Sequence, residues 1–170
     1  MRRMLMALVL ATGVAARAGA QAPLVAGHFG GAFGISIPTG GLSRTHAAGF
    51  NLAGIAEYQL PTEAVGIRGE LLYQRFDART GVSGVGSENT FGATVNALYN
   101  LQGSALRPYL IGGMGLYHLS DAGTRPGFNA GVGMRIPLTG MSAYFEARVH
   151  KVLTDGPSYV TVPFSFGLSF

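Results

Sequence analysis

The chain has 170 residues, 48% of them hydrophobic and only 12% charged, with 27 glycines and no cysteine. This length corresponds to one domain. The lack of cysteine excludes a disulfide scaffold, cysteine-ligated metal sites and a thiol nucleophile, and the many glycines disfavour a helical protein, because each glycine inside a helix costs about 1 kcal/mol.

Residues 1–22 carry the three parts of a secretory signal peptide. Two arginines precede an apolar run that begins at Met4, and small residues follow. The run is too short for a transmembrane helix, which needs about 20 apolar residues. We therefore expect cleavage after Ala20 or Ala22 and one mature domain over residues 23–170.

Removal of this signal takes away three arginines and leaves nine basic against eight acidic residues, a net charge of +1. No cluster of basic and aromatic residues remains, so we expect no nucleic-acid partner. The sequence also has no phosphate-binding glycine motif, and its histidines are too far apart to predict a metal site or a cofactor. These histidines are His28, His46, His118 and His150. We expect His46 to be a solvated loop residue and His150 to lie at a rim or in an interior.

A period-two alternation of apolar and polar residues recurs after the signal and predicts β-strands. In one such run Phe50, Leu52 and Tyr58 share a face, while Asn51 and Glu57 share the other. Two of the eight runs are less regular and rich in glycine. The eight expected strands are His28–Ile37, Phe50–Leu60, Val65–Phe76, Phe91–Leu101, Tyr109–Leu119, Phe128–Ile136, residues 143–151 and Val160–Phe170.

The connections between these strands fall alternately into two sets. One set is uniformly short: Pro61–Ala64, Gln102–Leu106 and Leu138–Met141. The other includes two long segments: Pro38–Ala48, Asp77–Thr90, Ser120–Pro126 and Thr154–Pro157. An antiparallel up-and-down arrangement places each set at one end, and closure into a barrel removes exposed strand edges. The expected fold is therefore an all-β, eight-stranded antiparallel barrel.

Charge decides which way this barrel faces. The polar faces of the strands carry three acids and three bases: Glu57, Arg68, Glu70, Arg135, Glu146 and Arg148. A soluble surface carries many more, about 25–35% of its residues. A small balanced set fits a narrow lumen, where an unpaired ion is costly, and strands of about 9–11 residues match a bilayer crossing. The sequence thus predicts a transmembrane barrel with an apolar exterior.

Two further expectations concern side chains within the strands. Tyrosines near strand ends suit an aromatic girdle at the membrane interface: Tyr58, Tyr73, Tyr99, Tyr109 and Tyr117. For the lumen charges we expect cross-strand partners, because two charged residues on one strand, such as Glu146 and Arg148, do not lie directly opposite each other.

The last strand ends in alternating apolar residues and a terminal phenylalanine. With the glycine-rich strands Pro108–Tyr117 and Gly131–Leu138, it makes the mature chain resemble the OmpA/OmpX-like family of eight-stranded bacterial outer-membrane β-barrels. The resemblance implies an integral protein of the outer membrane, surrounded by its lipids and probably exported as a monomer, and an assembly signal for the barrel-assembly machinery at Phe164, Phe166, Leu168 and Phe170. Pro163 departs from the pattern and predicts a bulge or a shorter paired region, because proline cannot donate to the strand ladder.

One segment suggests catalysis. His118 and Ser120 lie two residues apart, where an imidazole could activate a hydroxyl, and the segment resembles the H-x-S motif of outer-membrane lipid A deacylases. That family's acid lies on the next strand, but Phe128–Ile136 contains no carboxylate, and Asp121 is poorly placed. The alternative is a strand-end histidine followed by a turn, and we do not expect an enzyme.

The expected role is structural, adhesive or surface-interacting. An eight-stranded lumen is only wide enough for side chains to fill, so a large pore is not expected, although a narrow leak gated by ion pairs is an alternative. A lipid A acyl hydrolase and a soluble periplasmic, lipocalin-like barrel with an apolar cavity are the other two.

Overall fold

The structure is a computed structural model that describes residues 27–61, 64–101, 106–156 and 159–170. The expected signal peptide, residues 1–22, lies outside these ranges, so its cleavage site stays a prediction. Within the described ranges, no helix has the length and hydropathy that a membrane crossing requires.

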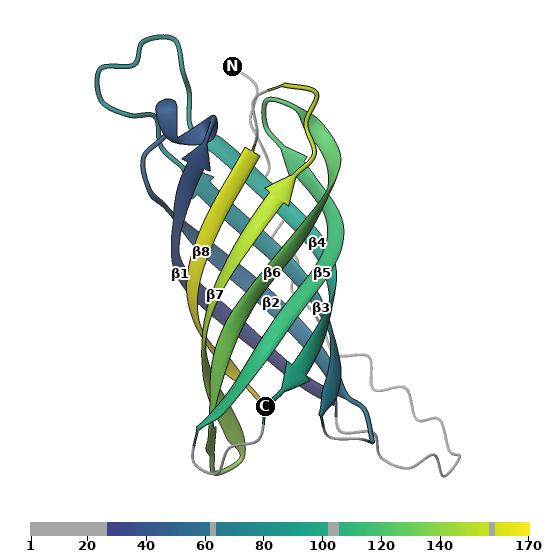
Figure 1. The fold of residues 1–170 in the computed structure, drawn as a ribbon. Helices are drawn as coiled ribbons and strands as arrows, with labels where there is room; N and C mark the ends of the chain where they lie inside the picture. Colours follow the sequence, from purple (N-terminus) through teal and green to yellow (C-terminus); the bar gives the residue numbers. More distant parts are fainter. Residues whose placement is uncertain (1–26, 62–63, 102–105, 157–158) are drawn as a thin grey trace, which may run out of the picture.

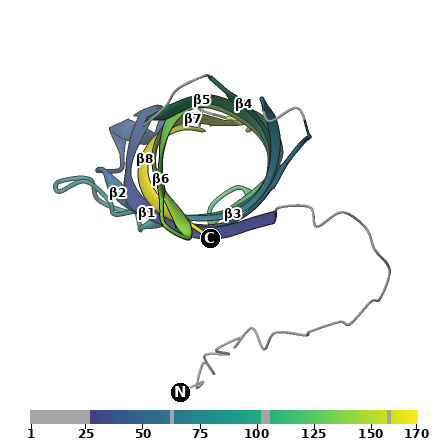
Figure 2. The same cartoon turned by 90° about the horizontal axis from the view of Figure 1, so that it is seen from below.

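Eight strands form one closed antiparallel barrel, which confirms the expected fold class (Figures 1 and 2). Each strand pairs with the next in sequence, and β1 pairs with β8 to close the ring. A single 3₁₀ turn, η1 (Leu42–Arg44), follows the first strand. The strands are β1 (Gly27–Gly40), β2 (Gly49–Gln59), β3 (Val65–Phe76), β4 (Glu88–Asn100), β5 (Arg107–Leu119), β6 (Gly123–Leu138), β7 (Met141–Val152) and β8 (Tyr159–Ser169).

Strands extend further toward one end than the sequence suggests. The expected connection Ser120–Pro126 is only the turn Ser120–Ala122, because β6 begins at Gly123 and pairs with Leu119 of β5. The longer connections, between β1 and β2 and between β3 and β4, lie at this same end (Figure 1). We call it the outer end, and the end with the C-terminus the inner end.

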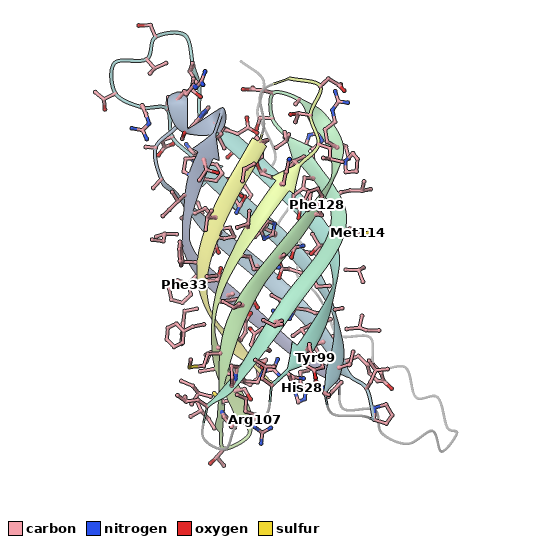
Figure 3. All side chains as sticks on the ribbon, in the orientation of Figure 1. His28, Phe33, Tyr99, Arg107, Met114 and Phe128 are labelled. Carbon is pink, nitrogen blue, oxygen red and sulfur yellow. The ribbon has the colours of Figure 1, made fainter. Side chains whose placement is uncertain are left out.

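The barrel is polar inside and apolar outside. Large apolar side chains project from the strands, including Phe33, Met114 and Phe128 (Figure 3), and Met114 is 72% exposed. Arg68, in contrast, is 0% exposed in the interior. This arrangement is the inverse of a soluble barrel with an apolar cavity, so the lipocalin-like alternative is wrong.

The expected girdle of tyrosines is only partly correct. Tyr58 and Tyr99 are exposed on the outer surface, and Tyr73 packs there between Phe50 and Phe91. Tyr109 and Tyr117 are each 1% exposed and point into the lumen. They were misplaced because β5 is so rich in glycine that neither of its faces has a clear polarity in the sequence.

Pro163 interrupts one ladder without forming a bulge. On the β7 side, pairing stops after Ala147 with Phe164 and resumes in the same register at His150 with Thr161. On the β1 side, pairing is continuous through Ser36 with Pro163. The missing proline donor therefore weakens only the β7–β8 ladder, as the shorter-pairing alternative predicted, and the bulge was wrong.

Candidate functional site

The six charged residues expected in the lumen all lie there and form one connected cluster, which we call the lumen network. Its members come from β2, β3, β6 and β7, and acids alternate with bases along it: Arg135, Glu57, Arg68, Glu146, Arg148 and Glu70. The three positive and three negative charges balance. A buried ion is tolerated when it is paired in this way.

Five ion pairs connect the lumen network from end to end. Glu57 accepts from Arg135 at 2.7 Å and from Arg68 at 2.9 Å. Arg68 also donates to Glu146 at 2.6 Å. Arg148 joins Glu146 at 2.8 Å to Glu70 at 2.5 Å. The contacts cross the barrel, so they hold strands together that are not neighbours in the sheet.

One pair departs from the sequence expectation. Arg148 and Glu146 are two residues apart on β7, yet the Arg148 Nε atom donates to Glu146 Oε1. The expectation that all partners are cross-strand was therefore wrong for this pair. Two side chains on the same face of one strand are close enough to bond when a long arginine bends toward the shorter glutamate.

Two tyrosines complete the lumen network. The Arg68 guanidinium lies over the rings of Tyr109, at 5.7 Å, and Tyr144, at 5.2 Å. The Tyr109 hydroxyl donates to Glu146 Oε2 at 2.7 Å. Stacking on aromatic faces stabilises a guanidinium that has lost its water. The sequence contained a signal for Tyr144, which shares the parity of Glu146 on β7.

Glycines make room for these rings. A Cβ atom at Gly133 would meet the ring of Tyr109, and one at Gly167 would meet the ring of Tyr144. The two inward glycines therefore have a packing reason, since only a residue without a side chain lets a ring lie against the barrel wall.

An uncharged polar layer lies above the lumen network, toward the outer end. The hydroxyl of Ser36 accepts from Asn51 at 3.2 Å and from Gln74 at 2.9 Å. His150 lies in the lumen, where its Nδ1 atom is 2.9 Å from the Tyr117 hydroxyl. Together the two layers fill the interior with paired polar groups.

The connections at the outer end are tied together by His46. This residue is 4% exposed, so the expectation of a solvated side chain was wrong. Its ring nitrogens lie 2.8 Å from the Thr45 hydroxyl and 3.2 Å from the Gly86 carbonyl. Arg79 donates to the His46 carbonyl at 3.1 Å. These bonds join the β1–β2 connection to the β3–β4 connection across 40 residues of sequence.

A cavity of about 470 Å³ opens between these connections. Leu42, Leu119 and Tyr159 contribute apolar surface to it, while Glu88 and Asp121 contribute carboxylates. The apolar outer band of β4 begins at Phe91, so Glu88 lies beyond the membrane-spanning part of the strand. Burial, with the nearby Asp121, raises the pKa of Glu88 to about 7, against the hydrogen bond from the Ser120 amide.

His118 and Ser120 do not form a catalytic pair. The His118 ring lies on the outer surface, 3.0 Å from the Thr124 hydroxyl. The Ser120 hydroxyl donates to the Asn89 carbonyl and accepts from the Asn89 amide, both at 3.0 Å. Among the hydrogen bonds of the described residues, none joins a carboxylate to the His118 ring. Ser120 thus continues the β4–β5 pairing into the turn.

The C-terminal residues continue the outward face of β8. Phe164 and Phe170 are exposed to the membrane side, and Phe33 contacts Phe166 with ring centroids 5.8 Å apart. Backbone bonds between Phe29 and Phe170 close the β1–β8 seam at the inner end. The role of these phenylalanines and Leu168 as an assembly signal stays a prediction.

A closed eight-stranded barrel with an apolar belt and a charged, filled lumen defines the class of outer-membrane β-barrels. The family model for the outer membrane protein beta-barrel domain matches residues 6–170, so the chain belongs to this family and to the bacterial outer membrane. This agrees with the resemblance stated from the sequence. No curated protein matches the sequence significantly.

Solved structures show the same fold at low sequence identity. Neisserial surface protein A (NspA) is 15% identical with a TM-score of 0.67, covering 84% of this chain and 95% of that one. Ail, the attachment invasion locus protein of Yersinia pestis, is 15% identical with a TM-score of 0.52, covering 85% and 97%. The outer membrane enzyme PagL is 14% identical with a TM-score of 0.51, covering 84% and 98%. At such identities the likeness concerns the fold alone.

Proposed function

We propose that this protein is a non-enzymatic, non-conducting barrel that presents its outer connections for adhesion or another surface interaction. The observation that carries the proposal is the combination of a plugged lumen with outer connections that are bonded to each other through His46. Similarity in fold to Ail, an attachment protein by its name, and to a surface protein of Neisseria supports this role.

The lumen network is the argument against transport. Arg68, Glu146 and Arg148 are all buried and joined by ion pairs that cross the interior. An ion that entered this layer would have to break such a pair, which costs several kcal/mol. We therefore expect no stable conductance when the purified barrel is added to a planar bilayer. Steady single-channel currents in the wild type would contradict this part of the proposal.

The adhesive role is tested on whole cells. One variant replaces Asp77–Ser87, the β3–β4 connection, with a glycine–serine linker of equal length, and a second carries only His46→Ala. We expect both to lower adhesion of expressing cells to coated surfaces, because each removes the bonded arrangement of the connections. The matched control is Thr139→Ser, which lies in the inner turn between β6 and β7. Equal adhesion by all four proteins, at equal surface amounts, would overturn the proposal.

The PagL similarity makes an enzyme test necessary. We expect Ser120→Ala to leave the acylation of lipid A in expressing cells unchanged, since the Ser120 hydroxyl is bonded to the Asn89 backbone rather than to His118. Mass spectrometry of extracted lipid A measures this. Deacylated lipid A with the wild type, lost in the variant, would show that the barrel is an enzyme after all.

A further inference from the structure

The outer surface of the barrel carries an apolar groove of about 780 Å³ across β1 to β5, which we call the outer groove. Gly31, Gly54 and Ala93 form its floor. Larger side chains form the walls: Phe33, Leu52, Leu71, Tyr73, Phe91 and Leu116. A second depression of about 640 Å³ continues from it over Ala56 and Gly69 and shares Gly54 and Leu71.

The strand register gives the direction of the outer groove. One wall follows a single row of paired residues across six strands: Phe33, Leu52, Tyr73, Phe91, His118 and Thr124. His118 is the last residue but one of β5, at its outer end, whereas Phe33 lies in the middle of β1. In Figure 3, Met114 of β5 likewise lies closer to the outer end than Phe33. The outer groove therefore descends from the outer rim to the middle of the membrane.

The glycine at the centre of this floor has no role in packing the barrel. A Cβ atom at Gly54 would have no heavy atom within 4 Å, whereas one at Gly167 would meet the ring of Tyr144. The backbone of Gly54 also has no positive φ angle. A larger residue would therefore fit at Gly54, and its absence keeps the groove open.

The two ends of the outer groove differ in polarity. The lower end is lined by Phe33 and Gly31. At the upper end lie His118 and Thr124, joined at 3.0 Å. One row further out, Arg75 is half exposed and holds Asp77 only at 3.4 Å. A cation and hydrogen-bonding groups thus stand where lipid phosphates lie, above a trough that faces hydrocarbon.

We propose that the outer groove binds one acyl chain of an anionic lipid of the outer leaflet, whose phosphate lies against Arg75 and His118. The dimensions agree: four steps between strands cover about 19 Å, and a leaflet contributes about 15 Å of hydrocarbon, which an oblique path lengthens. The inference depends on the outer-membrane placement and not on the adhesive role, so the two can fail separately.

The test is lipid retention by the purified barrel in native mass spectrometry, with dimyristoyl phosphatidylglycerol as the anionic probe and dimyristoyl phosphatidylcholine as the neutral one. We expect the wild type to retain one phosphatidylglycerol. Gly54→Leu fills the floor and should lower that retention about tenfold, the equivalent of about two methylene groups left unburied. The matched control is Gly112→Leu, on the outward face of β5, where an added Cβ meets no atom closer than 3.6 Å.

Arg75→Gln gives a second readout that does not alter the groove itself. It should remove the preference for phosphatidylglycerol over phosphatidylcholine and leave retention of the neutral lipid unchanged. Because Arg75 lies on the rim with only exposed partners, this variant should fold even if Gly54→Leu does not. Equal retention by the wild type, Gly54→Leu and Gly112→Leu would overturn the proposal, as would an unchanged lipid preference in Arg75→Gln.

Discussion

Arg68 shows how this barrel accommodates a charge that is wholly removed from water. The guanidinium donates to Glu57 and Glu146 and lies between the rings of Tyr109 and Tyr144. Each neighbour is itself held, since Glu146 also accepts from Arg148 and from the Tyr109 hydroxyl. A change to one residue therefore leaves several groups without partners, and its effect should be large.

Glu146→Ala is the sharpest test at this scale. It leaves Arg68 and Arg148 each without one partner, so we expect a loss of about 3–5 kcal/mol in the free energy of unfolding. Urea unfolding of the barrel in lipid vesicles measures it. Asp77→Ala is the control, because its pair with Arg75 is exposed, and such pairs contribute about 0–1 kcal/mol. An unfolding midpoint equal to that of the wild type would show that Glu146 is dispensable.

Gly167→Ala tests the contact between the barrel wall and a lumen ring. The added methyl group meets the Tyr144 ring, so the ring must shift away from Arg68. Overpacking of this kind costs about 1–3 kcal/mol. The same vesicle assay measures it, with Gly54→Ala, which has free space, as the matched variant. Equal midpoints for the two variants would contradict the packing role of Gly167.

At the scale of elements, the strands are uniform but their outer connections are not. The turn Ser120–Ala122 is short, whereas the connection after β3 folds back on the one after β1 through Arg79, His46 and an isolated bridge from His46 to Ala78. Glu88 stands beneath them and accepts from the Ser120 amide at 3.0 Å. Its ionisation therefore affects how well the elements at the outer end hold together.

The pH dependence of stability follows from Glu88. Its pKa in the folded protein is raised to about 7 from an ordinary value of 4.5, mainly by burial. Protonation thus favours the folded state: the contribution is complete below the ordinary pKa and is lost as the pH rises through the folded one. We expect Glu88→Gln, which keeps an acceptor for Ser120, to flatten the unfolding midpoint between about pH 4.5 and 7. An unchanged pH profile would contradict the assignment.

At the scale of the whole molecule, closure and the apolar belt act together. Pairing of β1 with β8 leaves no free edge, and the lumen network holds distant strands across the interior. In a membrane the backbone bonds of such a barrel have no competing water, so unfolding must be cooperative. The barrel should accordingly withstand detergents that unfold soluble proteins.

Heat-modifiability measures this property. Membranes that contain the protein are solubilised in mild detergent, and the gel mobility of the band is compared before and after boiling. We expect an unboiled, compact band and a boiled, shifted one, because the closed barrel resists the detergent until it is heated. A single mobility for both samples would contradict a closed barrel of this stability.

Much of this architecture was available from the sequence. Period-two alternation is a local property of strands, so it predicted eight strands, their antiparallel order and the inward face that carries Glu57, Arg68 and Glu146. The balance of three acids and three bases also predicted that these groups pair. The apolar face then followed, because a barrel with a charged lumen and few other charges can only expose its apolar side to lipid.

What only the tertiary structure decided are the contacts made across the barrel. Arg68 and Glu146 are 78 residues apart, and which of six charges meet depends on strand tilt and register, which alternation does not encode. The inward side of β5 was hidden for a related reason: glycine has no polarity, so Tyr109 and Tyr117 were assigned to the wrong surface. His46, the bonded Ser120 hydroxyl and the outer groove likewise arise where strands distant in sequence are brought together by closure of the sheet.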